Sequence, residues 1–315
     1  MNKKQLVIIC SAVIVTVLIG LTVFIVINKM NTIPIDLPSS SVPESEASSV
    51  YSESTPETNS EIISSEATSL LPSVSSSTVS PQYNIPEFSN ETINHLMSLD
   101  NTKKGYGWAG AESRQSYYAK YDAYAVGDQT KQTVYLTFDE GYEYKYTPAI
   151  LDVLKEKNVK AVFFVTMSYV KSNPELIRRM IDEGHTVGNH SVTHPSLPDC
   201  TLTKAYNEIK ELHDYMQKNY NYTMTLFRFP MGESSDRTLA LVKEMGYKSV
   251  FWNFAHRDWE TDNQPDHATA KASIARYTKN GTIFLLHAVS KTNTEILGEV
   301  IDNIRAKGYT IELFE

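Results

Sequence analysis

The chain has 315 residues, of which 41% are hydrophobic and 10% aromatic, and it carries a formal net charge of −8. A composition this apolar can build a core, which excludes a collagen-like or wholly disordered protein. Cys10 and Cys200 are the only cysteines, so a disulfide framework is excluded, and the acidic balance argues against a nucleic-acid-binding protein with a broad basic face.

The net charge is concentrated in one segment of the chain. Residues 1–30 sum to +3, residues 31–102 contain ten acidic residues and no Lys or Arg, and residues 103–315 sum to −1. The acidity is therefore a property of the middle segment, and the C-terminal part is almost neutral.

The first predicted element is a membrane-spanning helix at residues 6–27. These 22 residues carry no charge, and at about 1.5 Å per residue they can span a hydrocarbon core of about 30 Å. Lys3 and Lys4 precede the helix and only Lys29 follows closely, so the positive-inside rule predicts a single-pass protein of the cell membrane with its N-terminus in the cytoplasm. A cleaved signal peptide is the alternative, but its apolar region is usually about 7–15 residues long and ends in a small-x-small site, which residues 27–30 do not offer.

Residues 31–92 are predicted to form a disordered linker. The segment consists largely of Ser, Thr, Pro and Glu, so it cannot bury enough apolar surface to offset the entropy of ordering. A coil of this length has a mean reach of about 40 Å and would hold a C-terminal domain away from the membrane. An unselected spacer would have the same composition.

The rest of the chain is predicted to form one α/β domain, with an N-terminal extension at residues 93–132 and the main body of the domain at residues 133–315. Apolar strand patterns alternate with amphipathic helix patterns from residue 133 onward. Such alternation implies a parallel sheet, open or closed into a barrel, with ligands at the carboxyl ends of its strands. We expect strands at residues 133–138, 161–166, 186–189, 226–229, 248–252, 282–286 and 309–313, and helices at residues 147–157, 174–183, 202–218, 237–245, 268–278 and 294–307.

Candidate site residues follow the first and third of these strands. Asp139 and Glu140 end the first strand in the sequence TFDEG, where one carboxylate could bind a cation and the other could move a proton. Taken alone, this pair is more often part of a turn. His190 and His194 are four residues apart, which would put both imidazoles on one face of a helical turn, although a lone pair with this spacing is usually accidental. With a carboxylate from another strand end, they predict a metal site with open positions, suited to hydrolysis by an activated water.

Three later strand ends carry further candidates. Arg228 in FRFPMG could pair with a carboxylate and lower its pKa, or it could lie on the surface. Asp258 and Trp259 follow the strand that ends near residue 252, and Trp259 could wall a pocket or belong to the core. His287 ends TIFLLH and is either a satisfied core residue or an acid–base group. Four other histidines have no supporting pattern: His95, His213, His256 and His267.

In this order, the five segments resemble the polysaccharide deacetylase family, also called carbohydrate esterase family 4 or the NodB-homology domain. The family motifs TFDDG, H-[ST]-x-x-H-P, R-x-P-x-G, Asp-Trp and L-x-H are matched at residues 137–141, 190–195, 228–232, 258–259 and 285–287. The resemblance covers about residues 133–313. It implies an N-deacetylase with the family fold, a distorted (β/α) barrel of NodB type with fewer than eight regular units.

The resemblance also implies a role for each motif residue. Asp139 would be the catalytic base, oriented by Arg228, and Asp258 would pair with His287, the general acid. The substrate pocket would be formed by Pro230, Met231, Gly232, Trp259 and Leu285.

The implied cofactor is one divalent metal ion, commonly zinc, held by His190, His194 and Glu140. Glu140 departs from the family, which normally has Asp there, and Met231 replaces a frequent Tyr. Both departures, together with the sequences TFDEGYE and LLHAVS and the segment from residue 105 onward, resemble sporulation-type peptidoglycan deacetylases. Those enzymes act on N-acetylmuramic acid and work with an amidase to form muramic δ-lactam.

The expected function is therefore the removal of acetyl groups from N-acetylmuramic acid in a peptidoglycan strand. One alternative is deacetylation of N-acetylglucosamine or of another polysaccharide. A second alternative, prompted by Glu140, is a glycan-binding pseudoenzyme. The presence of Asp139, His190, His194 and His287 argues against it, because a binding module needs no acid–base pair.

Overall fold

The computed structural model describes residues 85, 87–95 and 108–315. The predicted membrane helix at residues 6–27 and nearly all of the predicted linker at residues 31–92 lie outside these ranges. Within the described ranges, no helix is both long enough and apolar enough to cross a membrane.

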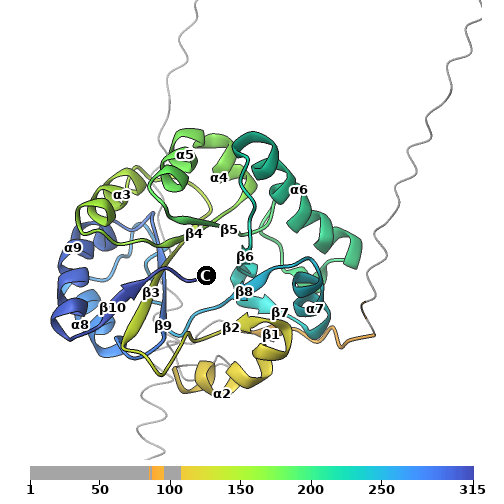
Figure 1. Cartoon of the computed structure of the whole chain (residues 1–315), viewed down its shortest axis with the longest axis horizontal. Helices are drawn as coiled ribbons and strands as arrows, with labels where there is room; N and C mark the ends of the chain where they lie inside the picture. The colour runs from red at the N-terminus through yellow and green to blue at the C-terminus, as the bar shows by residue number, and fades with distance from the viewer. Residues whose placement is uncertain (1–84, 86, 96–107) are drawn as a thin grey trace, which may run out of the picture. The chain divides into compact units, whose positions relative to one another are not determined.

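A curved parallel sheet forms the centre of the C-terminal domain (Figure 1). In the described residues it has eight strands in the order β10-β3-β4-β5-β6-β8-β2, with β9 also paired to β3. The seven predicted strands are confirmed, and the short β2 is additional. The strands are β2 (Ala123–Tyr124), β3 (Thr133–Glu140), β4 (Val162–Val165), β5 (Thr186–Asn189), β6 (Leu226–Phe227), β8 (Lys248–Val250), β9 (Thr282–His287) and β10 (Thr310–Glu312).

The segment that follows β8 connects one end of this sheet to the other. Phe254 forms a parallel bridge with Phe284 of β9, and the N–H of Leu285 donates to the carbonyl oxygen of Phe254 at 2.9 Å. Because β9 also pairs with β3, the sheet curves around an interior instead of lying flat. The expected barrel is thus a half-barrel of regular strands, spanned on its open side by irregular chain.

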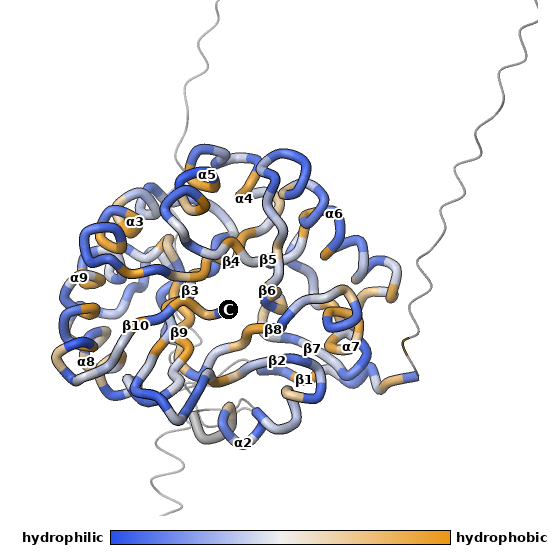
Figure 2. The backbone as a smooth tube through the Cα atoms, viewed as in Figure 1, coloured by the Kyte–Doolittle hydropathy of each residue, from blue (hydrophilic) through white to orange (hydrophobic). Residues whose placement is uncertain are grey.

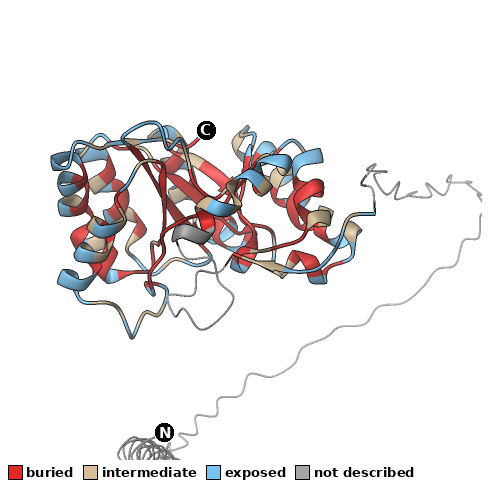
Figure 3. Ribbon diagram, turned by 90° about the horizontal axis from the view of Figure 1, so that it is seen from below, coloured by how far each residue is buried: buried red, intermediate tan, exposed pale blue. Residues whose placement is uncertain are grey.

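Helices cover the outside of the sheet (Figure 1). Figure 2 shows hydrophobic residues along the central strands and hydrophilic residues on the outer sides of the helices, and Figure 3 shows the strands buried between them. The six predicted helices are confirmed to within about three residues at each end, whereas α4 is too short to show helical periodicity in the sequence. The helices are α3 (Thr147–Glu156), α4 (Met167–Ser172), α5 (Pro174–Asp182), α6 (Leu202–Tyr220), α7 (Asp236–Glu244), α8 (His267–Tyr277) and α9 (Lys291–Ala306).

The N-terminal extension docks against the loop that follows β6. Its strand β1 (Ile93–Asn94) pairs antiparallel with β7 (Glu233–Ser234), and the N–H of His95 donates to the carbonyl oxygen of Gly232 at 2.9 Å. The Asn90 side chain donates to the carbonyl oxygen of Pro198 at 2.7 Å. Contacts with the domain therefore begin a few residues before the predicted boundary at residue 93.

His95 is fully buried in this extension, although nothing in the sequence pattern singled it out. Its Nε2 lies 2.6 Å from the carbonyl oxygen of Trp252, which can only accept, so Nε2 donates and Nδ1 accepts from the Tyr118 hydroxyl at 3.1 Å. Burial lowers the pKa of His95 to about 4, so the ring is neutral. The contact joins helix α2 (Trp108–Tyr118) to the chain that continues from β8.

Gly188 in β5 leaves room for an aromatic ring that lies beside the site described below. A Cβ atom on Gly188 would lie 2.4 Å from Cδ1 of Phe164, closer than real contacts allow. The same ring contacts the guanidinium of Arg228, whose central carbon is 4.1 Å from the ring centroid. The absence of a side chain at residue 188 thus determines where this ring can lie.

We predict that Gly188→Ala destabilises the domain by about 1–3 kcal/mol, because the added methyl group overpacks the Phe164 ring. The matched control is Gly298→Ala in α9, where the nearest atoms to the added Cβ are 3.7 and 3.8 Å away. That control should be neutral or stabilising by up to about 1 kcal/mol through helix propensity. Urea unfolding followed by circular dichroism measures both, and equal stabilities for the two variants would contradict the packing argument.

Candidate active site

A cavity of about 720 Å³ opens at the carboxyl ends of the parallel strands. Of the twelve residues predicted for the site, seven line this cavity and five do not. Those that line it are Asp139, His190, His194, Met231, Trp259, Leu285 and His287. Those outside the lining are all buried: Glu140, Arg228, Pro230, Gly232 and Asp258.

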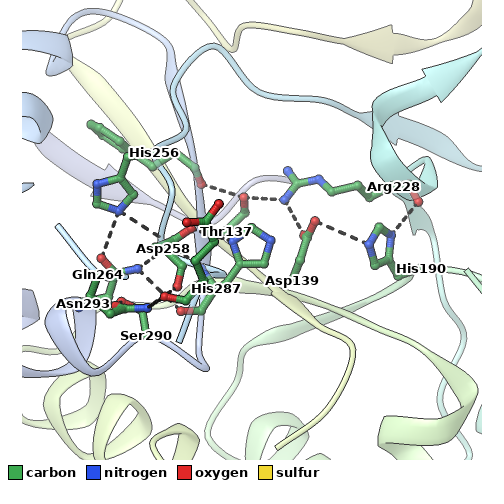
Figure 4. Close-up of polar contacts among 12 residues, drawn as sticks. Thr137, Asp139, His190, Arg228, His256, Asp258, Gln264, His287, Ser290 and Asn293 are labelled. Atoms are coloured by element: carbon green, nitrogen blue, oxygen red, sulfur yellow. Dashed lines mark hydrogen bonds and ion pairs between the residues drawn. The ribbon is translucent and has the colours of Figure 1, made fainter. Parts of the chain in front are cut away.

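Asp139 and Arg228 form a buried ion pair, as the sequence analysis expected (Figure 4). Nη1 of Arg228 donates to Oδ1 of Asp139 and to Oγ1 of Thr137, both at 2.8 Å. Burial alone would raise the pKa of Asp139, but the charge and hydrogen bond of Arg228, with a contribution from the charge of His287, outweigh it and hold the pKa below its usual value. Asp139 is therefore ionised at neutral pH.

His190 is held in one tautomer by the backbone. Its Nδ1 lies 2.9 Å from the carbonyl oxygen of Arg228, which can only accept, so the proton is on Nδ1 and the lone pair is on Nε2. Burial lowers the pKa of His190 to about 4, which keeps the ring neutral. Its Nε2 faces Oδ2 of Asp139 at 3.5 Å. Both of these atoms carry lone pairs, so at this distance they favour a positively charged group between them.

His194 lies beside His190, with ring centroids 4.7 Å apart. The expectation that both lie on a helical turn is wrong, because Ser191 and His194 have φ angles of 69° and 58°. The loop is held by Glu208 of α6, whose carboxylate accepts the N–H groups of Val192 and Thr193 at 3.1 and 2.8 Å. Glu208 carries no sequence signal, because a single acidic residue on an amphipathic helix is ordinary.

Glu140 does not join the two histidines in this structure. It follows Asp139 in β3, and alternation along a strand turns its side chain to the opposite face. It is fully buried, and neither carboxylate oxygen has a hydrogen-bond partner. Burial raises its pKa well above the usual value, and the charges of Glu143 and Asp139 add to that shift. Among the described residues, no group of three or more His, Cys, Asp or Glu side chains is arranged to hold a metal ion.

His287 and Asp258 form the second charged pair of the site (Figure 4). Nδ1 of His287 lies 2.8 Å from Oδ1 of Asp258, and the backbone N–H of His287 donates to Oδ2 at 2.7 Å. Burial alone would lower the pKa of His287, but the charge and hydrogen bond of Asp258, with a contribution from Asp139, raise it. The imidazole is therefore biased toward its protonated form, and Nε2 is the nitrogen that remains for the cavity.

Apolar side chains form most of the rest of the cavity wall. Met231 has a φ angle of 56°, which places it in the wall while its neighbours in the turn are buried. The Trp259 ring centroid is 5.7 Å from that of His287. Tyr142 and Trp252 also line the cavity, although neither was predicted from the sequence. Tyr142 follows TFDEG directly, and that position was the available signal.

We predict that Asp258→Asn lowers the pKa of His287 by about one pH unit or more, because the charge that offsets its burial is removed. Histidine-selective ¹⁵N NMR titration of the full-length chain measures this pKa directly. The control is Asp302→Asn, an exposed residue of α9 paired with Lys157. An unchanged pKa of His287 in Asp258→Asn would contradict the electrostatic coupling described above.

The chain is similar in sequence to known polysaccharide deacetylases. The family profile described as Polysaccharide deacetylase matches residues 126–250. The peptidoglycan-N-acetylmuramic acid deacetylase PdaA of Bacillus subtilis is 41% identical over 194 residues, which are 61% of this chain and 74% of that protein. The peptidoglycan-N-acetylglucosamine deacetylase PgdA of Listeria monocytogenes is 34% identical over 181 residues, which are 58% of this chain and 38% of that protein.

The fold is also similar to a solved structure. The structure of Bacillus subtilis PdaA, described as a family 4 carbohydrate esterase, matches with a TM-score of 0.65 and 37% identity, over 71% of this chain and 96% of that one. The strand-end motifs, the half-barrel and these similarities agree. The chain belongs to the polysaccharide deacetylase family, carbohydrate esterase family 4, and is a hydrolase that acts on carbon–nitrogen bonds.

Proposed function

We propose that the chain removes acetyl groups from N-acetylmuramic acid in peptidoglycan. The observation that carries the proposal is a carboxylate with a lowered pKa and an imidazole with a raised pKa facing one cavity, Asp139 and His287. A carboxylate that stays ionised and an imidazole that stays protonated in the same cavity are suited to act as base and acid in one reaction.

Asp139 would take a proton from the water that attacks the acetamide carbon. Its Oδ1 is occupied by Arg228, so Oδ2 is the oxygen left for this transfer. His287, protonated and oriented by Asp258, would then donate the Nε2 proton to the departing amine. A carbon–oxygen bond forms, the carbon–nitrogen bond breaks, and the products are acetate and an amino sugar. A backbone N–H near Met231 is our candidate donor to the oxyanion.

A divalent metal ion fits beside these groups. Neutral His190 presents its Nε2 lone pair toward the cavity, and the hydrogen bond from its Nδ1 to a carbonyl oxygen is the kind that orients metal-binding histidines. We propose His190 and His194 as the protein ligands, with zinc as the metal. The ion would supply Lewis-acid activation of water and of the acetamide oxygen. The buried position of Glu140 does not support the expected third ligand.

The substrate assignment rests on the sequences TFDEGYE and LLHAVS and on the similarity to PdaA. Trp259 and Leu285 provide an apolar wall for the acetyl methyl group, and Tyr142 provides an exposed ring at the cavity mouth. A cell-wall substrate requires the domain to act outside the cytoplasm. That is the side on which the predicted membrane helix at residues 6–27 would hold it.

We predict that the full-length chain releases acetate from muropeptides whose stem peptides an amidase has removed, and not from intact ones. Mass spectrometry of the products identifies the sugar that has lost its acetyl group. Asp139→Asn should reduce the rate by about 10²-fold or more, because it removes the base. Asp302→Asn, far from the cavity on α9, should leave the rate unchanged.

Each other product of this experiment selects one of the alternatives. Deacetylated glucosamine would identify the chain as an N-acetylglucosamine deacetylase. No acetate from any substrate, with several divalent metals supplied, would favour a glycan-binding pseudoenzyme.

We predict that His190→Ala lowers the zinc content of the purified full-length chain, measured by elemental analysis after dialysis against zinc. His267→Ala should leave the content unchanged, because that histidine lies on the surface in a pair with Glu295. Glu140→Gln should also retain the metal, because the side chain is turned away from the histidines. Loss of zinc in Glu140→Gln would show that Glu140 is a metal ligand after all. A zinc content in His190→Ala equal to that of the wild type would show that His190 is not a ligand.

A further inference from the structure

Two side chains that no sequence motif includes contact the oxygen of Asp258 that does not face the ring of His287. Nδ2 of Asn293 lies 2.6 Å from Oδ2 of Asp258. Nε2 of His256 lies 3.6 Å from the same oxygen and 3.0 Å from Oδ1 of Asn293. Figure 4 shows the contacts among these three side chains. Asn293, His256 and Asp258 are 2%, 6% and 0% exposed, so water does not replace these contacts.

The direction of each hydrogen bond follows from the atoms involved. Oδ1 of Asn293 can only accept, so Nε2 of His256 must carry the proton and donate to it. The amide group of Asn293 then points its NH₂ toward Asp258. If the amide were flipped, its oxygen would face the carboxylate and its NH₂ would face the N–H of His256. The carboxylate of Asp258, which can only accept, therefore fixes which way the amide of Asn293 points, and the N–H of His256 holds the amide in that orientation.

The carboxylate of Asp258 is fixed on both sides by these bonds. Oδ2 accepts the backbone N–H of His287 and the NH₂ of Asn293, which leaves Oδ1 for the ring of His287. Rotation of the carboxylate would break two short bonds that have no replacement in a buried environment.

Asn293 and His256 together form a clamp on Asp258. This clamp is anchored at the start of α9. The backbone N–H of Asn293 donates to Oγ of Ser290, which caps the helix, at 3.0 Å. Ser290 Oγ also contacts Oε1 of Gln264, and Nε2 of Gln264 donates to the carbonyl oxygen of Asp258 at 2.7 Å. The loop that carries Asp258 and the helix that carries Asn293 are thus tied together at two points.

We propose that Asn293 and His256 are positioning residues for the general acid of the reaction. They lock Asp258 so that His287 keeps Nδ1 on the carboxylate and Nε2 toward the substrate. The inference rests on the proposed function, in which His287 gives a proton to the departing amine.

Loss of the clamp has a defined electrostatic consequence. The charged and titratable groups that act on His287 are Asp139 of β3, Arg228 after β6, and Asp258 after β8. His194 of the loop after β5 couples to it as well. Asn293→Leu removes none of these groups but frees the carboxylate of Asp258 to turn, so the raised pKa of His287 should fall toward the value that burial favours.

The test uses two deletions and one conservative replacement in the full-length chain. Asn293→Leu removes the donor to Asp258, and His256→Phe removes the donor to Asn293. His256→Gln keeps an amide N–H for the same bond and should retain most of the activity. His267→Phe, an exposed histidine on α8, is the matched control.

For Asn293→Leu and His256→Phe we expect kcat for acetate release to fall about tenfold or more, with KM changed less than about twofold, because neither residue touches substrate. The basic limb of the pH–rate profile should move to lower pH by about half a unit or more. A fall in kcat with an unmoved basic limb, or a His256→Gln variant as impaired as His256→Phe, would overturn the proposal.

The pKa of His287, measured by histidine-selective ¹⁵N NMR, separates this inference from the proposed function. The clamp predicts a lower pKa of His287 in Asn293→Leu and a nearly normal pKa in His256→Gln, whether or not the chain turns over a given glycan. An inactive wild-type chain would refute the proposed function, whereas an unchanged pKa in Asn293→Leu would refute the clamp. Asn293→Ser, a smaller change, replaces Asn293→Leu if the latter does not fold.

Discussion

The buried ion pair between Arg228 and Asp139 is the interaction on which the site depends. Removing two charges from water costs several kcal/mol for each ion, so the surrounding structure must supply partners for both. Arg228 donates to the carbonyl oxygens of Val250 and Phe251 and to Thr137, as well as to the carboxylate. These partners come from β3 and from the end of β8, so the strands must meet at this point for the charges to be stable.

The same pair connects the remaining functional groups. The carbonyl oxygen of Arg228 holds His190 in the tautomer that presents Nε2 to the cavity, and the charge of Asp139 contributes to the raised pKa of His287. One arginine therefore orients Asp139 through its side chain and His190 through its backbone. A carbon–nitrogen hydrolase needs these groups in different protonation states within one cavity, and burial beside opposite charges produces that separation.

Glu140 is one of the two motif positions, with Met231, at which the chain departs from its family, and its side chain lies in an unusual environment. An unpartnered carboxyl group in a fully buried position is costly in its charged state, which is why its pKa is raised. Meanwhile Glu208 and the N-terminal extension hold the histidine loop and the Met231 turn from behind. The cavity is thus built by residues outside the family motifs as much as by those within them.

The sequence by itself determined the class of fold, the order of strands and helices, and the residues at the strand ends, because periodicity and motif spacing are local properties. It also predicted the pairs Asp139–Arg228 and Asp258–His287, through the resemblance to a family. Only the tertiary structure decided which side chains converge. Strand alternation turned Glu140 away from the histidines, positive φ angles replaced the expected helical turn, and residues distant in the chain, Asn293 among them, closed around Asp258. Such contacts depend on which side chains are buried together and on where each side chain points, and a local sequence pattern encodes neither.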